Sequence, residues 1–425
     1  MAAVANRNEI YCEILRDELQ VATGCTEPIA VAYAAARARE LLGSIPTSAE
    51  IHVSGNILKN VKSVIVPNSG GLRGVRAALA AGVIAGNAAK KLQVLSEICT
   101  QDIPLIKDFA ENTIITVSCV YTSLQLDITI VLHSVNHTSK VRIANRHTNI
   151  VFESLDDCVF LDLPVEEEPK QSVVENQLTI EDIMDFADHC DLEPLRDLLK
   201  RQIDFNSAIA REGMRGHYGA QVGRTLIERM PNDIDTRARA MAAAGSDARM
   251  NGCELPVVIL SGSGNQGIAA SVPVVEYAHY LGKSDDDLMR ALLVSNLITV
   301  QEKADVGRLS AFCGAVSSGC GAAAGIAYLC GGDVEMIANT VTNALAAASG
   351  IICDGAKSSC AAKIALAVEA GLQGYHMSCK GLHFGPGEGI VAANANDTIA
   401  NVGKVAKQGM AITDKVIIDI MLSAT

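Results

Sequence analysis

The sequence contains no tryptophan, and aromatic residues make up only 4% of its 425 positions. Hydrophobic residues nevertheless account for 49%, and most of them are alanine, valine, isoleucine or leucine. Because so few large rings are available, we expect a core of closely packed helices that touch through small side chains. The length is sufficient for two domains, or for one large domain that carries an insertion.

Clusters of basic residues are also missing. The formal net charge is −13, the isoelectric point is about 5.2, and no run of lysine or arginine is interleaved with aromatics. Nucleic-acid backbones are bound through clustered Lys and Arg, so we expect no nucleic-acid partner. The N-terminal segment MAAVANRNEIYCEIL carries charges where a secretion signal needs an apolar core, and no apolar run reaches the ~18 residues of a membrane helix. We therefore expect a cytoplasmic protein without a membrane partner.

Hydrophobic periodicity separates two kinds of segment along the chain. Helical spacing marks the first forty residues and everything from Thr179 onward, whereas the region between them is rich in strand patterns around a glycine-rich helical hairpin. An acidic stretch near residue 171 is predicted to be a solvated linker. We therefore predict an α+β fold, in which residues 1–45 and 175–425 form a mostly helical catalytic domain and residues 46–174 form a smaller inserted α/β domain. The predicted strands are EIHVSG, VKSVIVP, TIITVSCVYT, LDITIVLH, KVRIAN, NIVFES and DCVFLDL.

Four of the thirteen cysteines stand at glycine- or turn-bounded starts of helical segments. They are Cys25 in ATGCTEP, Cys313 in LSAFCGAVSSGCGAAAG, and Cys353 and Cys360 in IICDGAKSSCAAK. The positive end of a helix lowers the pKa of a thiol and favours the thiolate, which is the form that binds metal. None of these cysteines belongs to a zinc-type C-x-x-C pair. Three converging thiolates would leave one corner of a 4Fe–4S cluster open as a Lewis acid.

The alternative for any of these thiols is a small residue of the core, which is the common role of a free cysteine in an alanine-rich helix. Cys320 lies seven residues after Cys313, and for it both interpretations stay open. We assign the core role to the remaining eight cysteines, which are Cys12, Cys99, Cys119, Cys158, Cys190, Cys253, Cys330 and Cys379.

Glycine turns before two helices are candidate substrate sites. In SGSGNQG, the backbone N–H groups of Gly264, Asn265, Gln266 and Gly267 open a predicted helix, and such a helix start binds anions such as carboxylates. The two amide side chains suit a zwitterion. In SGGLRG, Arg73 can pair with a carboxylate through two hydrogen bonds. A purely structural turn remains the alternative at both places, and neither has the surroundings of a dinucleotide fingerprint.

Several ionisable residues near the cysteines are candidates for acid–base work. Lys303 and Lys357 can act as bases if they are desolvated; otherwise they pair with Asp305 or Asp354 and have no chemical role. His383, in the turn GLHFGPGEG, titrates in a suitable range, although a structural histidine is an equal alternative.

ATGCTEP, SGSGNQG, KADVGRLSAFCGA and ICDGAKSSCA together resemble the L-cysteine desulfidase family, which is related to the iron–sulfur L-serine dehydratase alpha chain. The resemblance covers essentially the whole chain. It implies a 4Fe–4S cluster and the breakdown of L-cysteine to pyruvate, ammonia and sulfide without pyridoxal phosphate. Cys313 and Cys353 match cluster cysteines of the family, and Cys25 matches a cysteine associated with its active site. Cys360 matches a third cluster cysteine of the related dehydratases, with a shorter gap.

The resemblance thus leaves four cysteines for three ligand places, with Cys25 either as a ligand or as a catalytic thiol. A small-molecule substrate is implied, and a homo-oligomer is compatible with the sequence. One alternative is dehydration of L-serine on the same cluster. A second alternative is a cysteine-binding or redox-sensing protein without turnover. The residue that takes the proton from Cα is not identified by the sequence.

Overall fold

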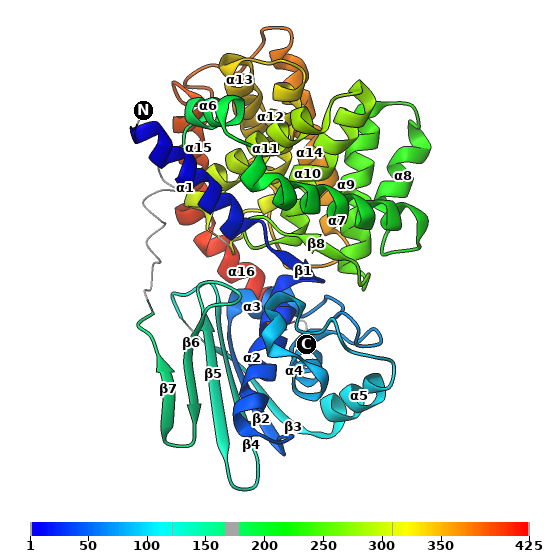
Figure 1. Ribbon diagram of the computed structural model, residues 1–425, viewed down its shortest axis with the longest axis vertical. Coiled ribbons are helices and arrows are strands. Elements are labelled where there is room, and N and C mark those ends of the chain that lie inside the picture. The colour runs from blue at the N-terminus through cyan, green and yellow to red at the C-terminus, as the bar shows by residue number, and fades with distance from the viewer. Residues whose placement is uncertain (1, 121, 166–177, 308, 424–425) are drawn as a thin grey trace.

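The computed structural model describes residues 2–120, 122–165, 178–307 and 309–423 (Figure 1). Helices fill the upper part of this view, and a mixed β-sheet with its covering helices fills the lower part. The arrangement confirms the predicted α+β fold class. Within the described ranges, no helix is both long enough and apolar enough to cross a membrane.

The lower part is built on six strands in the order β3-β2-β4-β5-β6-β7. β2 and β3 run parallel, and the other neighbouring strands are antiparallel. The register places Ile51 of β2 between Val117 of β3 and Ile130 of β4. The strands are β2 (Ser48–Ser54), β3 (Ile114–Val120), β4 (Asp127–His133), β5 (Thr138–Ala144), β6 (Ile150–Leu155) and β7 (Cys158–Asp162).

Helix α2 (Thr26–Leu42) packs on this sheet. Its Arg37 pairs with Glu153 of β6 at an Nε–Oε1 distance of 2.7 Å, and Ser139 of β5 donates to the carbonyl oxygen of Ala38 at 2.8 Å. Apolar side chains of α2, of α4 (Gly74–Ala85) and of the strands share one buried core. The predicted domain boundary after residue 45 stays a prediction, but α2 itself packs with the sheet. The remaining elements of this part are a 3-10 helix (Ala88–Gln93) and α5 (Asp102–Asn112).

The upper part is centred on α11 (Asp285–Val306), α12 (Gly314–Leu329) and α14 (Cys360–Ser378). A Cβ atom on Gly319 of α12 would lie 2.6 Å from the carbonyl oxygen of Ala367 in α14, so these two helices approach more closely than any side chain at that position allows. This contact agrees with the expected small-residue packing. The surrounding helices are α1 (Ala2–Glu18), α6 (Ile180–His189), α7 (Arg196–Arg215), α8 (Val222–Arg229), α9 (Ile234–Met250), α10 (Gly264–Leu281), α13 (Val334–Ala348) and α15 (Ala395–Lys404).

Short elements join the two parts. β1 (Val21–Thr23) pairs antiparallel with β8 (Pro256–Val258), and α3 (Gly55–Val61) and α16 (Met410–Ser423) lie where the two parts meet in Figure 1. Lys59 of α3 is buried and pairs with Asp414 of α16 at an Nζ–Oδ1 distance of 2.6 Å. Segments from both ends of the chain therefore meet at this junction.

The predicted strand VKSVIVP is wrong. α3 occupies its first residue, and Ile65 forms only an isolated bridge with Arg73. The chain turns into α3 directly after β2, and the residues after α3 pair within a local turn, where the Val66 N–H donates to the carbonyl oxygen of Leu72 at 2.9 Å. Most of the predicted acidic linker, and the predicted boundary at residue 174, lie outside the residues that the structure describes.

Candidate active site

Cys313 and Cys353 are brought together by backbone pairing. The Cys313 N–H donates to the carbonyl oxygen of Ile351 at 3.0 Å, and the Cys353 N–H donates to that of Ala311 at 2.6 Å. These bonds flank an antiparallel bridge between the residues preceding the two cysteines, Phe312 and Ile352. Cys313 is also the N-cap residue of α12, so its thiol stands at the positive end of that helix.

The pKa values of the two thiols are shifted in opposite directions. Their mutual hydrogen bond and their burial raise the pKa of Cys313 well above the ordinary value. The same hydrogen bond, together with the nearby Lys59, the backbone N–H of Gly355 and Lys363, lowers the pKa of Cys353 to about 5 against the effect of burial. The positive charges of Lys59 and Lys363 therefore favour the thiolate at Cys353, and the hydrogen bond between the thiols favours the proton on Cys313.

Cys360 and Cys25 lie close to the same small group of buried residues. Cys360 is the first residue of α14, and the charge of Cys353 contributes to raising the pKa of its thiol, after burial. Cys25 is the N-cap residue of α2 and forms a small buried cluster with Val64 and Met250. Cys360 packs against this cluster. The four cysteines singled out in the sequence therefore occupy one region: Cys25, Cys313 and Cys360 stand at the N-termini of α2, α12 and α14, and Cys353 lies in the loop before α14.

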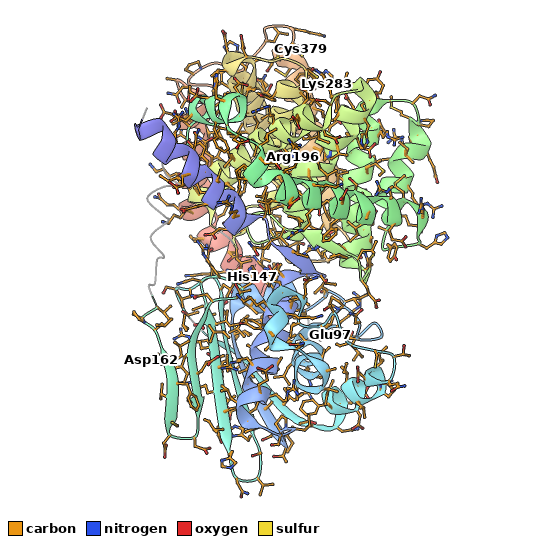
Figure 2. The ribbon with its side chains drawn as sticks, viewed as in Figure 1. Glu97, His147, Asp162, Arg196, Lys283 and Cys379 are labelled. Carbon is orange, nitrogen blue, oxygen red and sulfur yellow. The ribbon has the colours of Figure 1, made fainter. Side chains whose placement is uncertain are left out.

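Cys25 has a charged partner. Its thiol donates to Oε2 of Glu27 at 3.0 Å, and Oε1 of Glu27 lies 3.9 Å from Nε2 of His147. His147 is buried in the turn between β5 and β6, and Figure 2 shows it where the sheet meets the helical part. Burial alone would raise the pKa of Glu27, but His147 and Cys25 lower it to about 2. Burial and the charge of Glu27 raise the pKa of Cys25 well above its usual range.

The glycine turn of SGSGNQG joins the same region. The Thr26 hydroxyl donates to the carbonyl oxygen of Gly262 at 2.9 Å, which links the start of α2 to the turn before α10. A Cβ atom on Gly314 would lie 2.7 Å from Nε2 of Gln266, so this amide rests on the first residue of α12. The side-chain oxygens of Gln266 and Asn265 are buried without hydrogen-bond partners. The turn thus presents unsatisfied polar groups beside Cys25 and Cys313.

Two arginines differ sharply in their surroundings. Arg73, the predicted carboxylate partner, is exposed, and its guanidinium donates to the carbonyl oxygen of Ser63 at 2.6 Å. Arg249, in the last turn of α9, is buried. A Cβ atom on Gly264 would lie 2.4 Å from its Nε, so its guanidinium rests on the start of α10.

The candidate bases are already engaged. Lys357 pairs with Asp354 at an Nζ–Oδ1 distance of 2.5 Å and donates to the carbonyl oxygen of Gly355 at 3.1 Å. Lys303 is buried in α11 and has a partner. His383 is exposed in the loop before α15.

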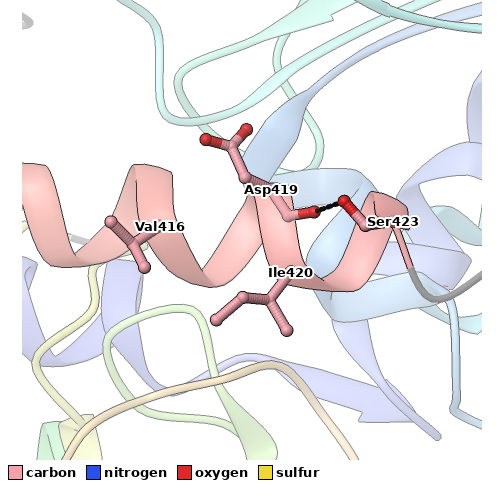
Figure 3. A pocket seen from close by; sticks show the side chains of 4 residues that line it. All are labelled: Val416, Asp419, Ile420 and Ser423. Carbon is pink, nitrogen blue, oxygen red and sulfur yellow. Dashed lines mark hydrogen bonds between the residues drawn. The ribbon is translucent and has the colours of Figure 1, made fainter.

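A hollow also lies on the outside of α16 (Figure 3). It is lined by Val416, Asp419, Ile420 and Ser423, and the Ser423 hydroxyl donates to the carbonyl oxygen of Asp419 at 2.8 Å. None of these residues is a member of the cysteine-containing region.

The donor set is compatible with an iron–sulfur cluster. Among the described residues, no three His, Cys, Asp or Glu side chains are close enough to hold a single metal ion. In a 4Fe–4S cluster, however, each thiolate binds a different iron atom, so the sulfurs need not meet at one point. Cys313, Cys353 and Cys360 influence one another's pKa, and lysines lower that of Cys353. Half-buried thiols with nearby positive charge suit a cluster that carries negative charge.

The sequence model of the serine dehydratase alpha chain matches residues 89–419, and the chain belongs to this family. The family points to a lyase. Among curated proteins, the chain is 51% identical over 416 residues to a UPF0597 protein of Desulfitobacterium hafniense, covering 98% of this chain and 97% of the relative. It is 46% identical over 411 residues to a UPF0597 protein of Lachnoclostridium phytofermentans, covering 97% and 99% respectively. A third UPF0597 protein, from Treponema denticola, is 40% identical over 429 residues, covering 99% of this chain and all of the relative.

Sequence reasoning missed four residues of this region, which are Glu27, Lys59, His147 and Arg249. Glu27 had a local signal, since it follows Cys25 by two residues. Lys59 and His147 come from the sheet-containing part, and only the fold brings them to the cysteines. Arg249 ends an alanine-rich helix, where an arginine is ordinarily a solvated residue.

Proposed function

We propose that this protein is an L-cysteine desulfidase, which eliminates sulfide from L-cysteine to give pyruvate, ammonia and hydrogen sulfide. The observation that carries the proposal is the convergence of Cys313, Cys353 and Cys360 beside the amide of Gln266. A half-buried cysteine set next to an unsatisfied polar turn suits a reaction in which a small zwitterion meets a metal centre. The family match supports a lyase.

In this proposal, Cys313, Cys353 and Cys360 hold a 4Fe–4S cluster. Lys59 and Lys363 favour the thiolate at Cys353, which is the form a ligand requires. When bound, the cluster would supply an open iron corner as a Lewis acid for the leaving group. In this proposal Lys357 is not a base. Its ion pair with Asp354 orders the loop between the ligands Cys353 and Cys360.

Cys25 and Glu27 are proposed to handle the proton from the substrate. An α,β-elimination requires removal of the proton at Cα. The Cys25 thiol can pass its own proton to Oε2 of Glu27 along their 3.0 Å hydrogen bond as Sγ accepts one from the substrate. His147 stabilises the ionised form of Glu27 between turnovers. The burial of all three side chains keeps bulk water from competing for the proton.

L-serine is the second candidate substrate, since the family is named for serine dehydratase. The same residues would serve this reaction, with water leaving in place of sulfide. The nature of the leaving group distinguishes the two, because a thiolate is a softer ligand than a hydroxyl.

Purification under strict anaerobiosis tests the proposal. We expect bound iron and acid-labile sulfide, and faster release of sulfide from L-cysteine than of pyruvate from L-serine. The reverse preference would make the protein an L-serine dehydratase. Iron without turnover of either amino acid would favour a cysteine-binding or redox-sensing role. A protein without iron would contradict all cluster-dependent readings.

A further inference from the structure

The guanidinium of Arg249 is a buried cation without a counter-charge. The side chain is 2% exposed, and its Nε and Nη2 atoms are buried without hydrogen-bond partners. None of the ion pairs found among the described residues involves Arg249, and its charge acts instead on the neutral thiol of Cys25. Arginine keeps its positive charge at physiological pH, and burying an unpaired charge is strongly unfavourable. An anion that binds there would remove this cost.

The guanidinium faces a helix start that also lacks partners. It rests on Gly264, where a Cβ atom would lie 2.4 Å from Nε and 2.7 Å from Cζ. The N-cap residue of α10, Ser263, makes no side-chain hydrogen bond to the first turn. The first backbone N–H groups of a helix have no intrahelical acceptor, and together with the helix dipole they attract anions. A fork of two guanidinium donors beside these N–H groups matches the two oxygens of a carboxylate.

Amide oxygens complete the lining. The buried Oδ1 of Asn265 and Oε1 of Gln266 have no donors, and both residues belong to the first turn of α10. Such acceptors suit an ammonium group next to the carboxylate. Gln266 rests on Gly314, the residue after Cys313, and Thr26, the residue after Cys25, donates to Gly262. An amino acid anchored here would therefore lie between Cys25 and Cys313.

We propose that Arg249 and the N-terminal N–H groups of α10 form a binding site for the α-carboxylate of an amino acid, with Asn265 and Gln266 accepting from its α-ammonium group. The site selects free amino acids against their amides and esters, which lack the negative charge. The assignment of this amino acid as the substrate rests on the proposed function, whereas the binding site itself does not.

Binding of L-alanine, which has no leaving group, tests the site without any turnover. Calorimetric titration of the anaerobically purified protein compares L-alanine with L-alaninamide, and we expect the wild type to prefer L-alanine by about 100-fold. Arg249→Gln is expected to abolish this preference, and Arg249→Lys to keep part of it. Arg237→Gln is the control, since Arg237 lies on the same helix, is 57% exposed and pairs with Glu276. It should bind like the wild type.

An unchanged preference in Arg249→Gln, or no preference in the wild type, would overturn the proposal. If Arg249→Gln does not fold, Gly264→Ala decides the question, because its methyl group would push the guanidinium off the start of α10. The same loss of preference is then expected, and an unchanged preference overturns the site. A protein that prefers L-alanine through Arg249 yet releases no sulfide from L-cysteine would uphold the carboxylate site and refute the desulfidase proposal.

Discussion

The thiol of Cys25 donates a hydrogen bond to the carboxylate of Glu27 at 3.0 Å, and both side chains are buried. The pair stands at the first turn of α2, where the sheet-containing part meets the helical part. The raised pKa of Cys25 and the lowered pKa of Glu27 both favour the proton on sulfur, so its transfer to Glu27 requires that Sγ accept a proton from the substrate at the same time. Two predictions follow from this hydrogen bond.

Cys25→Ser should retain the iron but release sulfide from L-cysteine about 10²–10⁴-fold more slowly, the range for loss of a positioned proton-transfer group. Iron content and sulfide release are measured on the same anaerobic preparation. Cys99→Ser is the control: the core role expected for Cys99 is wrong, because this residue is exposed and hydrogen-bonds only to Asp102 nearby. Loss of iron in Cys25→Ser would instead make Cys25 a cluster ligand. Wild-type values for both measurements would leave it a structural cysteine.

Glu27→Gln should slow sulfide release by a similar factor, because the neutral amide accepts no proton from the thiol. The iron content should remain that of the wild type, since Glu27 contacts Cys25 and His147 and none of the three proposed ligands. Steady-state kinetics across pH provides the measurement. Normal turnover in Glu27→Gln would exclude Glu27 as the proton acceptor.

Cys313→Ser and Cys353→Ser should each abolish iron binding, because each removes one of the two paired thiols. Iron and sulfide are quantified after anaerobic reconstitution. The matched control is Cys320→Ser on the same helix, α12, where the buried thiol faces the carbonyl oxygen of Val341 at 3.7 Å. This variant should reconstitute normally. Near-full occupancy in either ligand variant would refute the assignment.

Asn265→Ala should raise KM for L-cysteine about 10-fold and lower kcat much less. The side-chain oxygen is buried without a donor, so its loss removes one hydrogen bond to the bound substrate. The kinetics must be measured on protein with a full complement of iron. Exposed Asn112, which binds only Asp108 on its own helix, serves for comparison as Asn112→Ala. An unchanged KM would indicate that the SGSGNQG turn has only a structural role.

The buried carboxyl of Glu302 should make the free energy of unfolding depend on pH. It is 3% exposed in α11, and burial raises the pKa of its carboxyl from 4.5 to about 8, with Ser317 and Cys320 opposing part of the shift. A carboxyl with a raised folded-state pKa binds more protons when folded, so its contribution to stability falls as pH rises from about 4.5 to about 8. Because glutamine does not ionise, Glu302→Gln should not show this loss of stability with rising pH.

We therefore expect Glu302→Gln to unfold like the wild type near pH 4.5 and to be more stable at pH 8, by on the order of 3 kcal/mol. Urea denaturation at a series of pH values measures the difference. Exposed Glu335→Gln should show no such trend. A difference between Glu302→Gln and the wild type that stays constant with pH would show that folding does not raise the pKa of Glu302.

The sequence predicted the fold class because periodicity is a local property. Six of the seven predicted strands are present, as β2 to β7. The seventh, VKSVIVP, is no strand because its backbone pairs within a local turn, where the Val66 N–H donates to the carbonyl oxygen of Leu72 and Ile65 bridges only to Arg73. The helix α3 before it binds Asp414 through Lys59, 355 residues away, and no local pattern contains that contact.

The candidate site, like the fold, could be predicted from local sequence only in part. The placement of Cys25, Cys313 and Cys360 at helix starts was predictable from glycine and turn residues. The same prediction for Cys353 is wrong, because this residue lies in the loop before α14. The proximity of the four cysteines depends on pairing between loops. Arg249 could not be predicted as a site residue from the sequence. Its distinguishing property is the absence of a counter-charge, and burial and missing partners exist only in the folded chain.

The ion pair between Lys59 and Asp414 also links the cysteine-containing region to α16. Lys59 lowers the pKa of Cys353, and its own carboxylate partner is supplied by that helix. Removal of α16 would therefore leave Lys59 buried without a counter-charge, at a position that acts on Cys353. The helix thus supports the cysteine-containing region although it contributes no cysteine to it.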